Sequence, residues 1–133
     1  MIVLMLRLGL RAGEVAGLRL EDIDWRNAVV HVRGKRGRLD ALPLPVDAGG
    51  RLAAYLRQAR PRSTRHREVF LGCDAPHAVV SWAAVSSMTA RAMRSAGITG
   101  AGRGTPMRHT AAFRVLVAGG GLLRPGSCCD TRT

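Results

Sequence analysis

The chain has 133 residues, the size of a single domain with one hydrophobic core. Apolar residues make up 47% of it, which excludes a disordered protein, but only 4% are aromatic, so Leu, Val, Ala and Met must fill the core. The 21 basic residues against 9 acidic ones give a formal charge of +12, which attracts polyanions such as nucleic acid or an acidic membrane surface.

The first twenty residues predict two helices with a junction between them. Residues 2–10 are almost entirely apolar and predict a short, mostly buried helix. Gly9 breaks this pattern, and helical spacing of apolar residues resumes over residues 12–20. Arg11 is therefore expected where one helix ends and the next begins.

From residue 28 the apolar pattern changes to the alternation of β-strands. The runs AVVHVRG and RLDALPLP flank a glycine-bounded basic turn, GKRG, and so predict a β-hairpin with Lys35 at its tip. After the hairpin, Asp47 is expected to cap a helix over residues 48–59, which Pro61 ends.

The second half of the chain predicts further helices and one short strand. Residues 69–71 are expected to form the strand, and Ser81 begins a helix that reaches about Ala96. Thr105, which precedes a proline, predicts the start of another helix, to about Ala118. The tail that follows has no helical or strand period and is expected to be irregular.

One motif follows the first helix. The run GLRAGEVAGLRLEDIDW, residues 9–25, holds Arg11, an acid three residues later and an Asp-Ile-Asp-Trp ending. Together these features resemble the segment of the tyrosine recombinases, or phage integrase family, that carries their first catalytic arginine. The resemblance implies that Arg11 is that arginine. Glu14 matches the acid that follows it, and we expect Glu14 to orient Arg11 as a structural partner.

The hairpin carries the second part of the resemblance. It is similar to the β-hairpin of these recombinases, whose turn lysine reaches into the minor groove beside the scissile phosphate. Lys35 holds that place and is the only lysine in the chain. An ammonium can give up a proton while a guanidinium effectively cannot, so Lys35 is expected to act as the general acid for the departing 5′ hydroxyl.

A third motif, TPMRHT at residues 105–110, resembles the family box His-x-x-Arg followed by His and Thr. The resemblance implies that Arg108 is the second catalytic arginine, which would hold the nonbridging phosphate oxygens together with Arg11. Thr105 stands where the family has His, and it fits a helix cap better than a catalytic group. His109 fits either a phosphate contact or packing within the helix.

The resemblance divides the chain into residues 1–120, a partial catalytic domain, and residues 121–133, an irregular tail unlike the family. The family's nucleophilic tyrosine has no counterpart, because the only tyrosine, Tyr55, falls on the apolar face of a predicted helix and is expected in the core. We therefore expect a truncated or frame-shifted product that binds DNA but does not cleave it alone.

The resemblance also implies the fold and the partners. The fold is expected to be α+β and mainly helical, with a small antiparallel hairpin or sheet packed on one side. The partners are double-stranded DNA and other recombinase subunits. No metal or cofactor is expected, because the cations are side chains. Three cysteines make no even disulfide framework, and no apolar run is long enough to cross a membrane, so we expect a cytoplasmic protein.

Two other functions remain open from the sequence, namely a non-catalytic DNA-binding regulatory module and an Arg-rich interaction protein that does not act on DNA. All but one of the basic residues are Arg, a skew that coding bias produces without selection for DNA. The arginines at positions 60 to 67 equally fit a DNA contact or a solvated loop. These arginines are Arg60, Arg62, Arg65 and Arg67.

Overall fold

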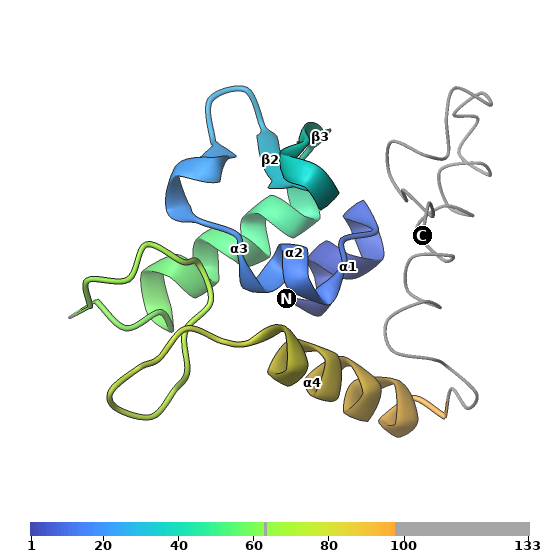
Figure 1. The fold of residues 1–133 in the computed structure, drawn as a ribbon, viewed down its shortest axis with the longest axis vertical. Coiled ribbons are helices and arrows are strands. Elements are labelled where there is room, and N and C mark those ends of the chain that lie inside the picture. Colours follow the sequence, from blue (N-terminus) through green and yellow to red (C-terminus); the bar gives the residue numbers. More distant parts are fainter. Residues whose placement is uncertain (63, 98–133) are drawn as a thin grey trace.

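The computed structural model of the protein describes residues 1–62 and 64–97, and these residues combine four α-helices with one small antiparallel sheet (Figure 1). The α+β, mainly helical fold expected from the sequence is confirmed. The helices are α1 (Ile2–Leu8), α2 (Ala12–Ala16), α3 (Val46–Gln58) and α4 (Trp82–Ser95). The strands are β1 (Ile23–Asp24), β2 (Val29–Arg33) and β3 (Leu39–Pro43), and two short 3-10 turns are η1 (Leu20–Asp22) and η2 (Lys35–Gly37).

The junction between α1 and α2 forms as predicted, but α2 is much shorter than expected. Gly9 ends α1 in the left-handed region, at φ 68°, which glycine adopts without steric cost. The helix expected over residues 12–20 ends at Ala16. Beyond it, Arg19 pairs with Glu68 in an isolated β-bridge, so the backbone at Arg19 is extended and the helix cannot continue.

The predicted hairpin is confirmed, while the predicted third strand is wrong. Strands β2 and β3 pair from Val29 opposite Pro43 to Arg33 opposite Leu39. The third strand of the sheet is β1, which pairs with β2 from the side opposite β3, in the order β1-β2-β3. Residues 69–71 make only an isolated bridge, between Leu71 and Val79.

Helix α3 begins earlier than expected, at Val46, and Asp47 does not cap it. The residue at its cap is Pro45, and Asp47 lies within the first turn. The Asp47 carboxylate instead forms an ion pair with the guanidinium of Arg7 on α1. This pair ties the beginning of α3 to the first helix.

Helix α4 begins as predicted, because the Ser81 hydroxyl accepts a hydrogen bond of 3.2 Å from the backbone N–H of Ala84. Its buried residues include Thr89, whose hydroxyl donates to the backbone carbonyl of Val85 and lies 3.4 Å from the sulfur of Met5. The sequence did not single out Thr89. It places α4 against α1 as well as against α2.

The core lies between the helices and the inner face of the sheet. Figure 1 shows α3 crossing the middle of the molecule, with the sheet toward one end of the view and α4 toward the other. The core is built largely of aliphatic side chains, as expected, with Phe70 as its buried aromatic residue. Side chains with less than 2% of their surface exposed include Met5, Val15, Val30, Val69 and Val85.

Candidate functional site

Arg11 occupies the N-cap of α2, immediately after the turn made by Gly9. Arg11 is half-buried, and its backbone is extended, with φ −77° and ψ 155°. The Glu14 carboxylate, one turn into the helix, accepts a hydrogen bond of 2.7 Å from the backbone N–H of Arg11. Glu14 therefore fixes the main chain from which the Arg11 side chain leaves.

Lys35 lies at the exposed tip of the β2–β3 hairpin. The tip is closed by a hydrogen bond of 2.7 Å from the backbone N–H of Gly34 to the carbonyl of Arg38. Between these residues the backbone passes through the left-handed region twice, at Arg36 with φ 61° and at Gly37 with φ 74°. The turn thus presents Lys35, Arg36 and Arg38 to solvent within four residues.

A small hollow of about 40 Å³ lies between α2 and β2, and neither Arg11 nor Lys35 is among the residues that line it. Glu14, three residues after Arg11, lines this hollow from α2, and Arg33, two residues before Lys35, lines it from β2. Residues of α2 and β2, which are separate in the sequence, therefore line the same hollow. Its lining residues are Gly13, Glu14, Gly17, Leu18, Asp22, His31, Val32 and Arg33.

Hydrogen bonds lower the pKa of two acids near β1, Asp24 and Glu21. The pKa of Asp24 is lowered mainly by the backbone N–H and the side-chain amide of Asn27, which donate to its two oxygens at 3.0 and 2.7 Å. The pKa of Glu21 is lowered first by a hydrogen bond from its own backbone N–H, and also by the guanidinium of Arg67 at 3.3 Å. These two carboxylates stabilise the turn and the loop around β1.

The loop arginines divide into different environments. The Arg60 guanidinium donates to the backbone carbonyls of Pro61, His66 and Glu68, so it holds the loop closed from inside. Arg67 pairs with Glu21. Arg62 donates to a carbonyl at the end of α3. Arg65 is exposed.

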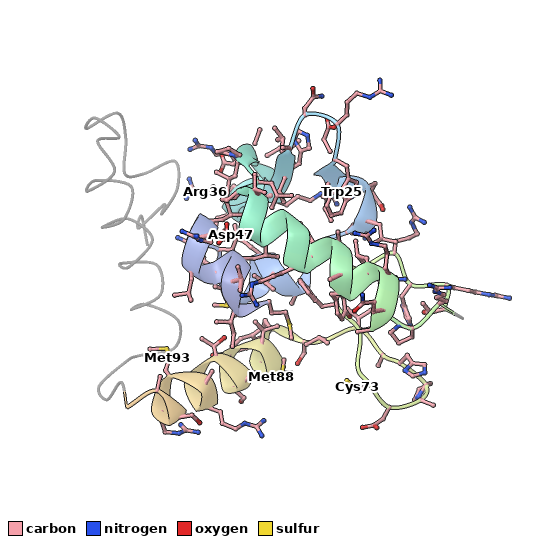
Figure 2. The ribbon with its side chains drawn as sticks, turned by 180° about the vertical axis from the view of Figure 1, so that it is seen from behind. Trp25, Arg36, Asp47, Cys73, Met88 and Met93 are labelled. Carbon is pink, nitrogen blue, oxygen red and sulfur yellow. The ribbon has the colours of Figure 1, made fainter. Side chains whose placement is uncertain are left out.

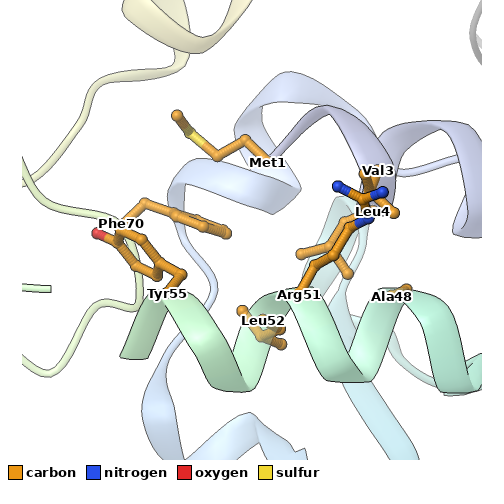
Figure 3. Close-up of a pocket in the computed structure, with 8 residues that line it drawn as sticks. All are labelled: Met1, Val3, Leu4, Ala48, Arg51, Leu52, Tyr55 and Phe70. Carbon is orange, nitrogen blue, oxygen red and sulfur yellow. The ribbon is translucent and has the colours of Figure 1, made fainter. Parts of the chain in front are cut away.

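Tyr55, which was expected in the core, is partly buried and packs against the core. Its ring packs against Phe70 with centroids 5.3 Å apart, and its hydroxyl accepts a hydrogen bond of 3.3 Å from the backbone N–H of Leu71. The same two rings line an apolar pocket of about 140 Å³ between α1 and α3 (Figure 3). Its lining is mostly apolar, and its charged groups are the Arg51 guanidinium and the amino terminus of Met1.

The structure does not describe every residue singled out in the sequence. Arg108, Thr105 and His109 are outside the described residues. Cys73, on the loop before α4, lies at the far side of the molecule from the hairpin residue Arg36 (Figure 2). Over residues 1–62 and 64–97 there is no group of three metal-ligating side chains and no helix that would span a membrane.

Sequence reasoning missed two residues of this region, Asp22 and Arg33. Asp22 is 6% exposed and is the only buried charged residue in the part of the chain that the structure describes. One of its oxygens lies 3.4 Å from the Arg33 guanidinium. Asp22 is the first residue of the Asp-Ile-Asp-Trp motif, but no local pattern indicates its burial or its partner on β2.

The sequence places the chain in a known family. The family model described as "Phage integrase family" matches residues 1–122, so the chain belongs to the phage integrase family. The chain is 43% identical, over 92% of its length, to the putative integrase/recombinase y4rA of Sinorhizobium fredii, and 36% identical, over 90%, to the tyrosine recombinase XerC 2 of Ralstonia nicotianae. It spans only 30% and 35% of these two relatives.

Solved structures agree on the fold. The XerA recombinase superposes with a TM-score of 0.83 at 21% identity, covering 98% of this chain and 47% of that protein. The XerH site-specific recombinase bound to its difH substrate, in a pre-cleavage complex, superposes with a TM-score of 0.78 at 16% identity and covers 99% and 38%. At these identities the similarity establishes the recombinase catalytic-domain fold.

Proposed function

We propose that residues 1–120 form part of a tyrosine recombinase catalytic domain that binds double-stranded DNA, with Arg11, Lys35 and Arg108 directed at one phosphodiester. The observation that carries this proposal is the family match over residues 1–122 together with the placement of Arg11 and Lys35. Arg11 caps a helix beside the hairpin that presents Lys35, and Glu14 and Arg33, near neighbours of the two cations in the sequence, line one hollow. The cytoplasm, where the DNA is, would be the site of action.

The chemistry of the three cations fits such a site. Transfer of a DNA phosphodiester develops negative charge on the nonbridging oxygens, and guanidiniums can hold these oxygens in a forked geometry. Arg11 and Arg108 would provide that clamp, with Glu14 holding the main chain of Arg11 in place. Lys35, on an exposed turn, would donate a proton to the departing 5′ oxygen. Thr105 would support the site as the cap of the helix that carries Arg108, and His109 would either contact the phosphate or pack within that helix.

The 133 residues do not supply the nucleophile. Tyr55 is the only tyrosine, and its hydroxyl accepts a hydrogen bond from the backbone N–H of Leu71 at the edge of the core. We therefore propose DNA binding without strand cleavage by these residues alone. Other recombinase subunits are the proposed protein partners, because site-specific recombination joins two DNA segments.

The proposal is tested by the salt dependence of binding to a labelled DNA duplex. Each phosphate neutralised by a side chain contributes about 0.9 to the slope of log affinity against log salt. We expect a steep slope for the natural chain, and a slope lower by about one for Lys35→Ala. The matched control is Arg51→Ala, which also removes one exposed cation but from α3, and it should leave the slope nearly unchanged. A flat salt response of the natural chain would favour an interaction protein that does not act on DNA.

A suicide DNA substrate tests the second part of the proposal. Such a substrate traps any covalent protein–DNA intermediate, and we expect none. A covalent adduct at Tyr55 would contradict its structural role, and an adduct at any residue would contradict the proposed lack of a nucleophile.

A further inference from the structure

Asp22 is an unusual residue in this protein, because it is charged and buried at the same time. Its side chain is 8% exposed, and it lies in η1, between α2 and the sheet. A carboxylate removed from water must be compensated by hydrogen bonds or by an opposite charge. Both compensations are present, and each comes from a different segment.

The first partner of Asp22 is local. One carboxylate oxygen accepts a hydrogen bond of 2.9 Å from the backbone N–H of Arg19, which closes the turn at η1. This contact requires a hydrogen-bond acceptor at position 22, but an asparagine or serine side chain would also accept from the same N–H. The turn alone therefore does not require a charge.

The second partner comes from the hairpin. The other oxygen of Asp22 lies 3.4 Å from Nη2 of Arg33, the last residue of β2. Arg33 is two residues before Lys35, so this ion pair joins the root of the lysine-bearing tip to the body of the protein. Glu14 lines the same hollow as Asp22 and Arg33, so the contact lies beside the turn that carries Arg11.

We propose that Asp22 is a positioning residue, which holds the hairpin through Arg33 and thereby sets the orientation of Lys35 relative to Arg11. This inference rests on the proposed function, because it assigns Asp22 a part in aligning the two cations. Nothing in it requires Asp22 or Arg33 to touch the scissile phosphate.

The hairpin also contains a matched control. Arg38 forms an ion pair with Asp40 at 2.8 Å, and both residues belong to the hairpin itself. Arg33 and Arg38 are similarly exposed, at 56% and 59% of their side-chain surface. Arg33→Met and Arg38→Met therefore remove the same charge from the same hairpin, but only Arg33→Met detaches the hairpin from Asp22.

The orientation of the tip can be measured without DNA. Nitroxide labels on Arg36→Cys at the tip and Gln58→Cys at the end of α3, with the native cysteines changed to serine, give a distance distribution by electron paramagnetic resonance. We expect Arg33→Met and Asp22→Asn to broaden this distribution. We expect Arg33→Lys, which keeps the cation, to stay near the starting width, and Arg38→Met to leave it unchanged.

A second readout connects the orientation to binding. Arg33→Met should weaken binding to the DNA duplex by ~2- to 5-fold more than Arg38→Met, the effect expected for loss of a partly exposed ion pair beyond the loss of one charge. Equal distance distributions for Arg33→Met and Arg38→Met would overturn the inference even if DNA binding is strong. A natural chain that fails to bind DNA would overturn the proposed function and leave the distance measurement intact.

Discussion

The Glu14 carboxylate accepts a hydrogen bond of 2.7 Å from the backbone N–H of Arg11, so the acid of the motif acts on the main chain of the arginine. An acid three residues after the cap also suits the positive end of a helix. The pair therefore fixes the start of α2 and the point from which the Arg11 side chain leaves.

The first prediction concerns this hydrogen bond. Glu14→Ala removes the acceptor and should lower the free energy of unfolding by about 1 kcal/mol, as for loss of a helix cap. Glu14→Gln keeps an oxygen that can accept from the same N–H and should retain most of that stability. Urea unfolding followed by circular dichroism measures both. Equal losses in the two variants would show that the charge of Glu14, and not the hydrogen bond, is what matters.

The second prediction compares two glycines. Gly37, two residues after Lys35, has φ 74°. Gly37→Ala should lower the free energy of unfolding by about 1 to 2 kcal/mol, because alanine is strained in the left-handed region. Gly50 lies inside α3, where a methyl group would meet no atom within 4 Å. Gly50→Ala should therefore raise the free energy of unfolding by about 0.5 to 1 kcal/mol. Thermal unfolding of both variants should give shifts of opposite sign, and a stabilising Gly37→Ala would contradict the conformation of the tip.

The third prediction separates two arginines of one loop. Arg60 donates to three backbone carbonyls of the loop, so Arg60→Met should cost about 1 to 3 kcal/mol of stability by leaving these contacts unmade. Arg65 is exposed, and Arg65→Met should change stability by less than about 0.5 kcal/mol. Chemical unfolding of the two variants distinguishes them. A stable Arg60→Met variant would mean that solvent replaces these hydrogen bonds.

The features that the sequence predicted correctly are those formed by residues close together along the chain. The hairpin and the start of α4 were predicted correctly, since strand alternation and the Ser81 cap are signals between near neighbours. The length of α2 was not, because Arg19 pairs with Glu68, a residue far along the chain. Strand β1 has two residues, which is too short to show any alternation.

The candidate site shows the same limit. The motif around Arg11 and the lone lysine at the hairpin were visible in the sequence, because each is a local pattern. The contact of Asp22 with Arg33 joins η1 to the end of β2, and no sequence pattern around either residue predicts that the two are partners. The role of the loop arginines was left open for the same reason, and the structure shows Arg60 bound to backbone carbonyls.

The last prediction concerns acid stability. The pKa of Asp47 is lowered, first by the hydrogen bond from the Arg7 side chain, and the two residues join α3 to α1. A carboxyl group whose pKa is lower in the folded state stabilises the fold above its unfolded pKa, about 3.9 for Asp, and this contribution is lost as the pH falls through the folded pKa. Asp47→Asn should therefore lower stability at neutral pH and flatten the loss of stability below about pH 4.

The partner of Asp47 provides the control for this effect. Arg7→Met leaves the carboxylate without its main hydrogen-bond donor, so it should flatten the same part of the pH profile. Both changes remove the same interaction. The double variant should therefore be only slightly less stable than either single variant. Unfolding free energies at pH 3, 5 and 7 for the four proteins test this. Strictly additive losses, with an unchanged acid slope, would show that the Arg7–Asp47 pair does not contribute to the stability of the fold.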